Sequence, residues 1–137
     1  MQIQLFLPQE YRAAHPQLFR AISRRWLYNI PRSLKTEGVR PLGMLAFLDH
    51  YEQLSRTLYA KLSELVKRSS DEKYRSTEPI RIYVMSSAHG GTGGAILIEI
   101  GYLIREIWRQ INWTNYRICA NLTAATTVEA NHYEMAA

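Results

Sequence analysis

Cysteine, paired metal ligands and long apolar runs are scarce in this chain of 137 residues, and Cys119 is its only cysteine. A single thiol can form neither an internal disulfide nor a cysteine cluster for zinc or an iron–sulfur centre. Met1 to Leu7 alternates polar and apolar residues and lacks the basic leader and apolar core of a signal peptide. No apolar run is long enough to cross a bilayer. These absences predict a cytoplasmic protein without a transmembrane segment.

Candidate metal ligands and acid–base pairs are also lacking. The four histidines, His15, His50, His89 and His132, lie far apart in the sequence, and no pair has the spacing of metal ligands. The adjacent carboxylates Asp71 and Glu72 fall in a polar stretch that is typical of a solvated loop. The sequence therefore predicts no catalytic group and no metal site of its own.

Basic residues are concentrated at the beginning of the chain. The net charge is +5, and the first 40 residues contain seven basic and two acidic side chains, whereas the rest is balanced. A helix carrying Arg20, Arg24 and Arg25 is one interpretation, and it would bind nucleic acid or an acidic partner. The alternative interpretation is an ordinary solvated helix face.

The hydrophobic periodicity predicts an α/β fold, a partial doubly wound, Rossmann-like parallel sheet with flanking helices. Ile80 to Met85 is an almost continuous apolar run, typical of a strand covered on both faces. A helix of about four turns follows and ends near Ile111, and a second strand follows at Tyr116 to Leu122. The other expected elements are a strand at Gln2–Leu7 and helices at Gln17–Ile30, Pro41–Lys67 and Val128–Ala137.

A glycine-rich segment joins the first of these strands to the helix after it, and it runs from Ser86 to Ala95. Glycine permits positive φ and a close approach of the backbone to a ligand, so consecutive amides can face one anion. The N-terminus of the following helix adds its dipole at the same place, and Thr92 offers a hydroxyl. Phosphate suits this arrangement. The Walker A loop and the dinucleotide fingerprint are excluded because their lysine and last glycine are missing, while a simple tight turn stays open as an alternative.

The loop resembles the G-G-G-T-G-S-G signature of tubulin and the bacterial cell-division GTPase, because Gly90, Gly91, Thr92 and Gly93 match it in order. Gly94 stands where that family has serine. Two further segments, Arg40–Gly43 and Ala130–Glu134, are similar to parts of a divergent group of bacterial tubulin-like proteins. Altogether the resemblance covers roughly residues 37 to 136.

The resemblance implies that Gly90 to Gly94 binds the phosphates of GTP or GDP, accompanied by Mg²⁺. It also implies a cytoskeletal protein that polymerises end to end, by self-association or with a partner chain. The candidates for residues near the nucleotide are Ala88, His89, Asn131 and Glu134. A partly exposed turn histidine is the alternative for His89, and helix capping or a surface position is the alternative for Asn131 and Glu134. The family's first glycine loop and its acidic catalytic loop are not found, so the resemblance leaves GTP hydrolysis by this chain open.

The whole chain, residues 1–137, is interpreted as one partial GTPase domain. A basic helical segment occupies residues 1–40, and residues 41–137 form a helix and a β-loop-α-β core that contains the glycine loop. An inactive, truncated remnant and a non-catalytic interaction module remain as alternatives to a nucleotide-binding protein.

Overall fold

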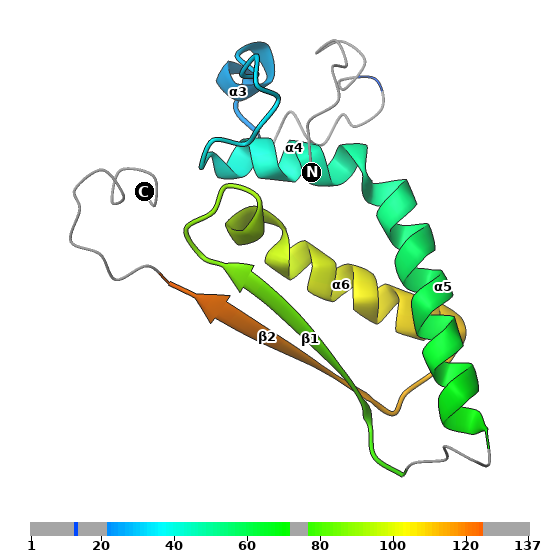
Figure 1. Cartoon of the computed structure of the whole chain (residues 1–137). Coiled ribbons are helices and arrows are strands. Elements are labelled where there is room, and N and C mark those ends of the chain that lie inside the picture. The colour runs from blue at the N-terminus through cyan, green and yellow to red at the C-terminus, as the bar shows by residue number, and fades with distance from the viewer. Residues whose placement is uncertain (1–12, 14–21, 72–76, 125–137) are drawn as a thin grey trace.

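The computed structural model describes residue 13 and residues 22–71 and 77–124, which form an α/β fold (Figure 1). The fold class is the one predicted. The expected strand at Gln2–Leu7 and the expected helix at Val128–Ala137 lie outside the described residues. In chain order the elements are α3 (Arg24–Tyr28), α4 (Arg40–Asp49), α5 (Tyr51–Ser70), β1 (Ile80–Ser87), α6 (Gly93–Ile111) and β2 (Tyr116–Thr123).

The centre of the fold is a β-α-β unit in which β1 and β2 pair in parallel through the α6 crossover. The register runs from Ile80 opposite Tyr116 to Ser87 opposite Thr123. The amphipathic stripe of α6 forms because its apolar residues recur at helical spacing, and it buries Leu103 and Ile107 against the sheet and α5. The predicted strand–loop–helix–strand order is confirmed.

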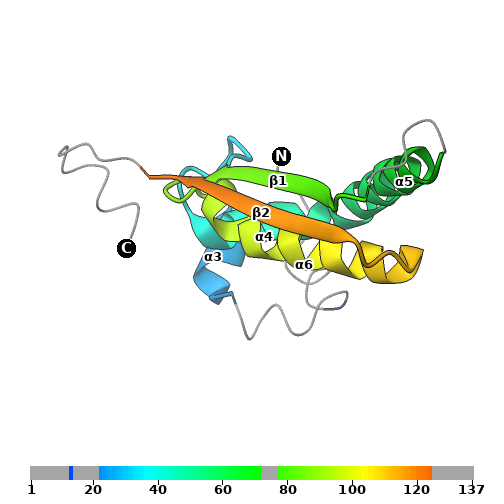
Figure 2. The same cartoon turned by 90° about the horizontal axis from the view of Figure 1, so that it is seen from below.

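Among the described residues, only one face of the sheet is covered by helices (Figure 2). The β1 residues Ile80, Ile82 and Val84 pack on the core around α6, whereas the residues between them face outward. Tyr83 and Met85 are 58% and 77% exposed. The prediction of a strand covered on both faces was therefore wrong for the described residues. Side chains point alternately to the two faces of a sheet, and the apolar composition of a strand does not indicate whether helices cover one face or both.

The long helix predicted from Pro41 to Lys67 is in fact two helices. His50 has φ −106° and ψ 4°, and its amide donates to the Phe47 carbonyl at 3.2 Å instead of continuing the α-helical pattern. Both α4 and α5 contact α6, and the bend at His50 gives them different directions along it (Figure 1). A continuous apolar stripe marks which residues are buried, but it carries no sign of such a bend.

The helix predicted from Gln17 to Ile30 is confirmed only from Arg24 to Tyr28, because residues 17–21 lie outside the described residues and Ile22 and Ser23 are not helical. Ser23 is extended, and its hydroxyl accepts a hydrogen bond from the Arg25 amide at 3.4 Å, so α3 begins only at Arg24. Serine favours this position because its side chain satisfies an otherwise unpaired amide of the first turn. Ile22, immediately before the cap, is buried against α4 with Leu42 and Leu45.

An exposed ion pair on α6 leads to a prediction about pH. Arg109 donates two hydrogen bonds to Glu106, at 2.9 and 2.7 Å, and these bonds, with a further one from Gln110, lower the pKa of Glu106 from 4.5 to about 2. A lowered carboxyl pKa means that the pair stabilises the fold above about pH 4.5 and that this contribution is lost as the pH falls toward 2.

We therefore expect Glu106 to stay ionised at about pH 3, where an ordinary glutamate is mostly protonated. A titration of the side-chain carboxyl carbons by NMR measures this directly. In an Arg109→Gln variant the Glu106 midpoint should return toward its ordinary value. A Glu106 midpoint near that of the other glutamates in the parent chain would contradict the prediction.

Candidate functional site

The glycine loop lies at the carboxyl end of β1, where the chain turns into α6 (Figure 1). Thr92 is the residue before the helix, and α6 begins at Gly93. The amide of Ala88 donates to the Thr123 carbonyl at 2.9 Å, which ties the start of the loop to the end of β2. The loop therefore lies at the carboxyl ends of both parallel strands, which is the usual place for ligands in open α/β sheets.

Four consecutive amides of the loop have no acceptor in the described part of the chain. The hydrogen bonds that close the turn begin one residue later, with the Gly94 amide donating to the Gly90 carbonyl at 2.9 Å and the Ala95 amide donating to the Thr92 carbonyl at 3.1 Å. The amides left over are those of Gly90, Gly91, Thr92 and Gly93. Gly91 is itself buried. Unpaired amides in sequence at a helix N-terminus are the elements of an anion site.

Close packing, not an unusual backbone angle, explains most of the loop glycines. None of the loop glycines has positive φ. A Cβ on Gly91 would lie 2.6 Å from the carbonyl carbon of Gly38, and one on Gly94 would lie 2.7 Å from the Ala88 oxygen. Gly93 is similarly close to the Ser86 hydroxyl. Gly90 differs, because a Cβ added there would have the Gly93 nitrogen as its nearest neighbour, at 3.9 Å.

A second segment, Thr36 to Arg40, forms a wall beside the loop. The hydroxyls of Thr36 and Thr92 are hydrogen-bonded at 3.0 Å, and Arg40 donates from Nη2 to the Ala88 carbonyl at 3.2 Å. Glu37 and Gly38 both have positive φ, which makes the tight turn that brings this wall against Gly91. Sequence reasoning did not assign Thr36 or Arg40 to the site, although Pro41 indicated that a helix begins here.

The electrostatics of this corner favour an anion. The amino ends of α4 and α6 meet where Gly91 packs on the Gly38–Val39 peptide, and neither helix has an acidic residue in its first turn. Each helix N-terminus carries a partial positive charge. The Arg40 side chain adds a full charge, and Arg40 is exposed to solvent. The corner therefore combines free amides, two helix dipoles and one guanidinium.

The other residues predicted near the nucleotide have different outcomes. Both backbone groups of Ala88 are occupied, the amide by Thr123 and the carbonyl by Arg40. The amide of His89 donates to the Ser87 hydroxyl at 3.4 Å, and the His89 residue is half-buried beside the loop. Asn131 and Glu134 lie outside the described residues, so their proximity to a nucleotide stays a prediction.

The basic segment at the beginning of the chain is only partly described. Arg25 is exposed, and its guanidinium carbon lies 5.5 Å from the centre of the Trp26 ring, a cation–π contact. Arg20 lies outside the described residues, and binding of nucleic acid or an acidic partner by this segment stays a prediction. Across residues 22–71 and 77–124, no helix is long and apolar enough to span a membrane. The same residues contain no group of three potential metal ligands.

A comparison with protein families decides what kind of chain this is. The family described as tubulin-like matches residues 8–134, which is nearly the whole sequence. The chain belongs to the tubulin-like family. Searches of curated proteins and of solved structures found no match. The family resemblance deduced from the glycine loop is thus confirmed, and the match extends into the basic segment before residue 37, where sequence reasoning recognised no family feature.

Proposed function

We propose that this tubulin-like chain binds the phosphates of a guanine nucleotide through Gly90 to Gly94. The observation that carries the proposal is the row of four amides, Gly90 to Gly93, without acceptors among the described residues. A nucleotide phosphate has several anionic oxygens that can accept from neighbouring amides without any change in the loop's own hydrogen bonds. The choice of guanine rests on membership of the tubulin-like family.

The wall formed by Thr36 to Arg40 adds two functions to the site. Arg40 places a positive charge next to Ala88, where it would offset the charge of a bound phosphate. The hydrogen bond between Thr36 and Thr92 fixes the turn at the amino end of α6. Magnesium would enter with the nucleotide, because in such sites it is held largely by phosphate oxygens and water. The proposal covers binding, and end-to-end assembly would follow from it as in other tubulin-like proteins.

Gly90→Ala is the sharpest test of this proposal. A Cβ at Gly90 meets no atom of the chain closer than 3.9 Å, so the fold should tolerate it. The new methyl group would nevertheless stand beside the free Gly93 amide, where the phosphate would lie. We expect isothermal titration with GTP and magnesium to show saturable binding by the parent chain and an affinity lower by about tenfold or more for Gly90→Ala.

Gly101→Ala is the matched control, since it makes the same chemical change in the middle of α6 with open space around it. It should bind GTP as the parent does and be more stable by up to about 1 kcal/mol, because alanine is the better helix former. Light scattering during the same titrations would report assembly. Equal GTP affinity in Gly90→Ala and the parent, or no binding by the folded parent at millimolar GTP, would overturn the phosphate assignment.

A further inference from the structure

A second candidate binding place lies on the helical layer, at the bend between α4 and α5. It is a small groove of about 180 Å³ where α4, α5 and α6 come together. Its lining is aromatic and acidic and consists of Phe47, Tyr51, Glu99, Tyr102, Leu103 and Glu106. All of these residues belong to the three helices, which lie on one side of the sheet (Figure 2). The groove therefore does not depend on what adjoins either edge of the sheet.

Two tyrosine rings of the groove are accessible to a ligand. Tyr51 is 43% exposed and Tyr102 is 63% exposed. The Tyr51 ring meets the buried Phe47 ring edge to face, with centroids 5.6 Å apart and planes 80° apart, and this contact helps to fix its position. The face of an aromatic ring carries partial negative charge, so it attracts a cation that lies over it.

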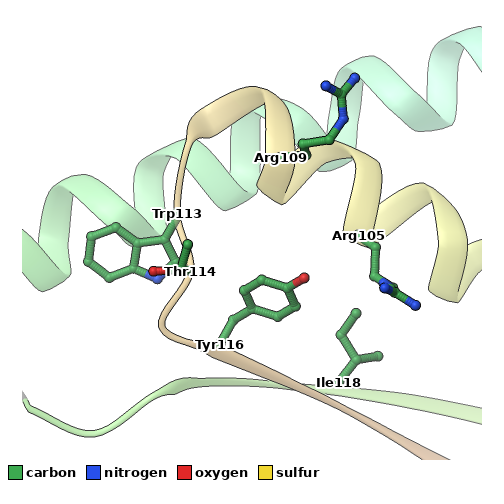
Figure 3. A pocket seen from close by; sticks show the side chains of 6 residues that line it. All are labelled: Arg105, Arg109, Trp113, Thr114, Tyr116 and Ile118. Atoms are coloured by element: carbon green, nitrogen blue, oxygen red, sulfur yellow. The ribbon is translucent and has the colours of Figure 1, made fainter.

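Two carboxylates give the groove its negative charge. Glu106 is paired with Arg109, which offsets its charge. Glu99 is half-buried and forms neither an ion pair nor a side-chain hydrogen bond with any residue that the structure describes. Arg105, the other arginine in this part of α6, lines a different groove between α6 and β2 (Figure 3). Glu99 is therefore the uncompensated charge of the helical groove, and a cation complements it.

The volume of the groove indicates the size of its occupant. Sites for small molecules measure roughly 300–1,000 Å³. At about 180 Å³ the groove is smaller than such a site and suits a single long side chain. Arginine fits better than lysine, because its planar guanidinium stacks on aromatic rings and its fork of donors matches a carboxylate. The apolar stem of an arginine also complements the buried Phe47 and Leu103.

We propose that this groove binds an arginine side chain presented by a partner protein. The guanidinium stacks on Tyr51 and Tyr102 and donates hydrogen bonds to Glu99. Its aliphatic stem packs on Phe47 and Leu103. Arginine is enriched among the residues that contribute most to the affinity of protein interfaces, where such anchors fill pockets on the partner.

Two short peptides that differ in one group test the proposal on the full chain. Each has three residues and blocked ends, with alanine on both sides of either arginine or citrulline, the uncharged isostere of arginine. Titration followed by NMR chemical shifts measures both affinities. We expect saturable binding of the arginine peptide with a Kd of about 1 mM, and binding of the citrulline peptide that is weaker by about fivefold, the effect of one exposed charge pair.

Two variants connect that preference to the groove. Glu99→Gln should remove the preference for arginine, and Tyr102→Leu should weaken binding of the arginine peptide about threefold through loss of a cation–π contact. Glu64→Gln is the matched control, because it makes the same change at an exposed glutamate of α5 that pairs with Arg68 and does not line the groove. It should leave both affinities unchanged.

Three results would overturn the proposal. They are equal affinity for the two peptides, an unchanged preference in a folded Glu99→Gln variant, and an arginine peptide whose binding does not saturate at tens of millimolar. Circular dichroism checks that each variant is folded. Sedimentation of the parent chain tests the identity of the partner. A dimer that dissociates on Glu99→Gln would show that a second copy, and not a different protein, supplies the arginine.

Discussion

Replacing Gly43 by alanine is expected to lower the free energy of unfolding by about 3 kcal/mol, within the range for forced overpacking of a core. A Cβ at Gly43 would overlap the carbonyl oxygen of Gly91 and would lie 2.9 Å from the Cβ of Ala95. The Gly91 oxygen is a backbone atom, so it cannot move away by a change of side-chain rotamer. Helix α4 would have to move away from α6, and the wall from Thr36 to Arg40 would move with it.

The same substitution should weaken the proposed binding of GTP, because the wall that carries Arg40 would no longer contact the loop. Urea unfolding followed by circular dichroism gives the stability, and isothermal titration of the fraction that is folded gives the affinity. Gly101→Ala serves again as the control, since both variants add one methyl group to a helical glycine. A Gly43→Ala variant as stable as the parent would show that α4 does not cross the loop as closely as described.

Replacing Trp108 by alanine should have the largest effect on stability, a loss of about 4 kcal/mol in the free energy of unfolding. Trp108 is 0% exposed and belongs to the core cluster that joins α4, α5 and α6. Its ring also stacks on Tyr116 of β2. The alanine variant would leave a large cavity and free the end of β2, and denaturant unfolding measures the cost.

Trp108→Phe separates the contribution of the ring from that of the indole nitrogen. The Nε1 atom of Trp108 is buried and has no hydrogen-bond partner within the described residues. An unpaired buried donor costs about 1–3 kcal/mol, so phenylalanine would keep an aromatic contact while removing that cost. We expect the free energy of unfolding to fall by less than about 2 kcal/mol. The cavity left by the smaller ring destabilises the fold, and removal of the unpaired indole donor offsets part of that loss. A loss as large as that of Trp108→Ala would contradict this account of the core.

The central β-loop-α-β unit was predictable because its signals are local. The apolar run of β1, the glycines that follow it and the stripe of α6 lie within one short stretch, and each has a period that its own backbone geometry imposes. The tubulin-like signature at Gly90 to Gly93 falls in the same stretch. Membership of the family therefore followed from the sequence, and the family match over residues 8–134 confirms it.

The features that were missed depend on contacts between distant residues. The turn at His50 accompanies the packing of α4 and α5 on α6, and the bare face of β1 reflects which side the helices occupy. Thr36 joins the loop through Thr92, a residue 56 positions later. No periodicity or spacing encodes a pairing of that kind.

The sequence by itself determined the order of strand, glycine loop, helix and strand, and hence the family. Only the tertiary structure decided which amides of the loop stay unpaired, that Gly91 and Gly43 are glycines because two backbones meet there, and that Arg40 stands over the site. The physical reason is that backbone preferences act over a few residues, whereas packing and hydrogen-bond pairing depend on groups that only the fold brings together.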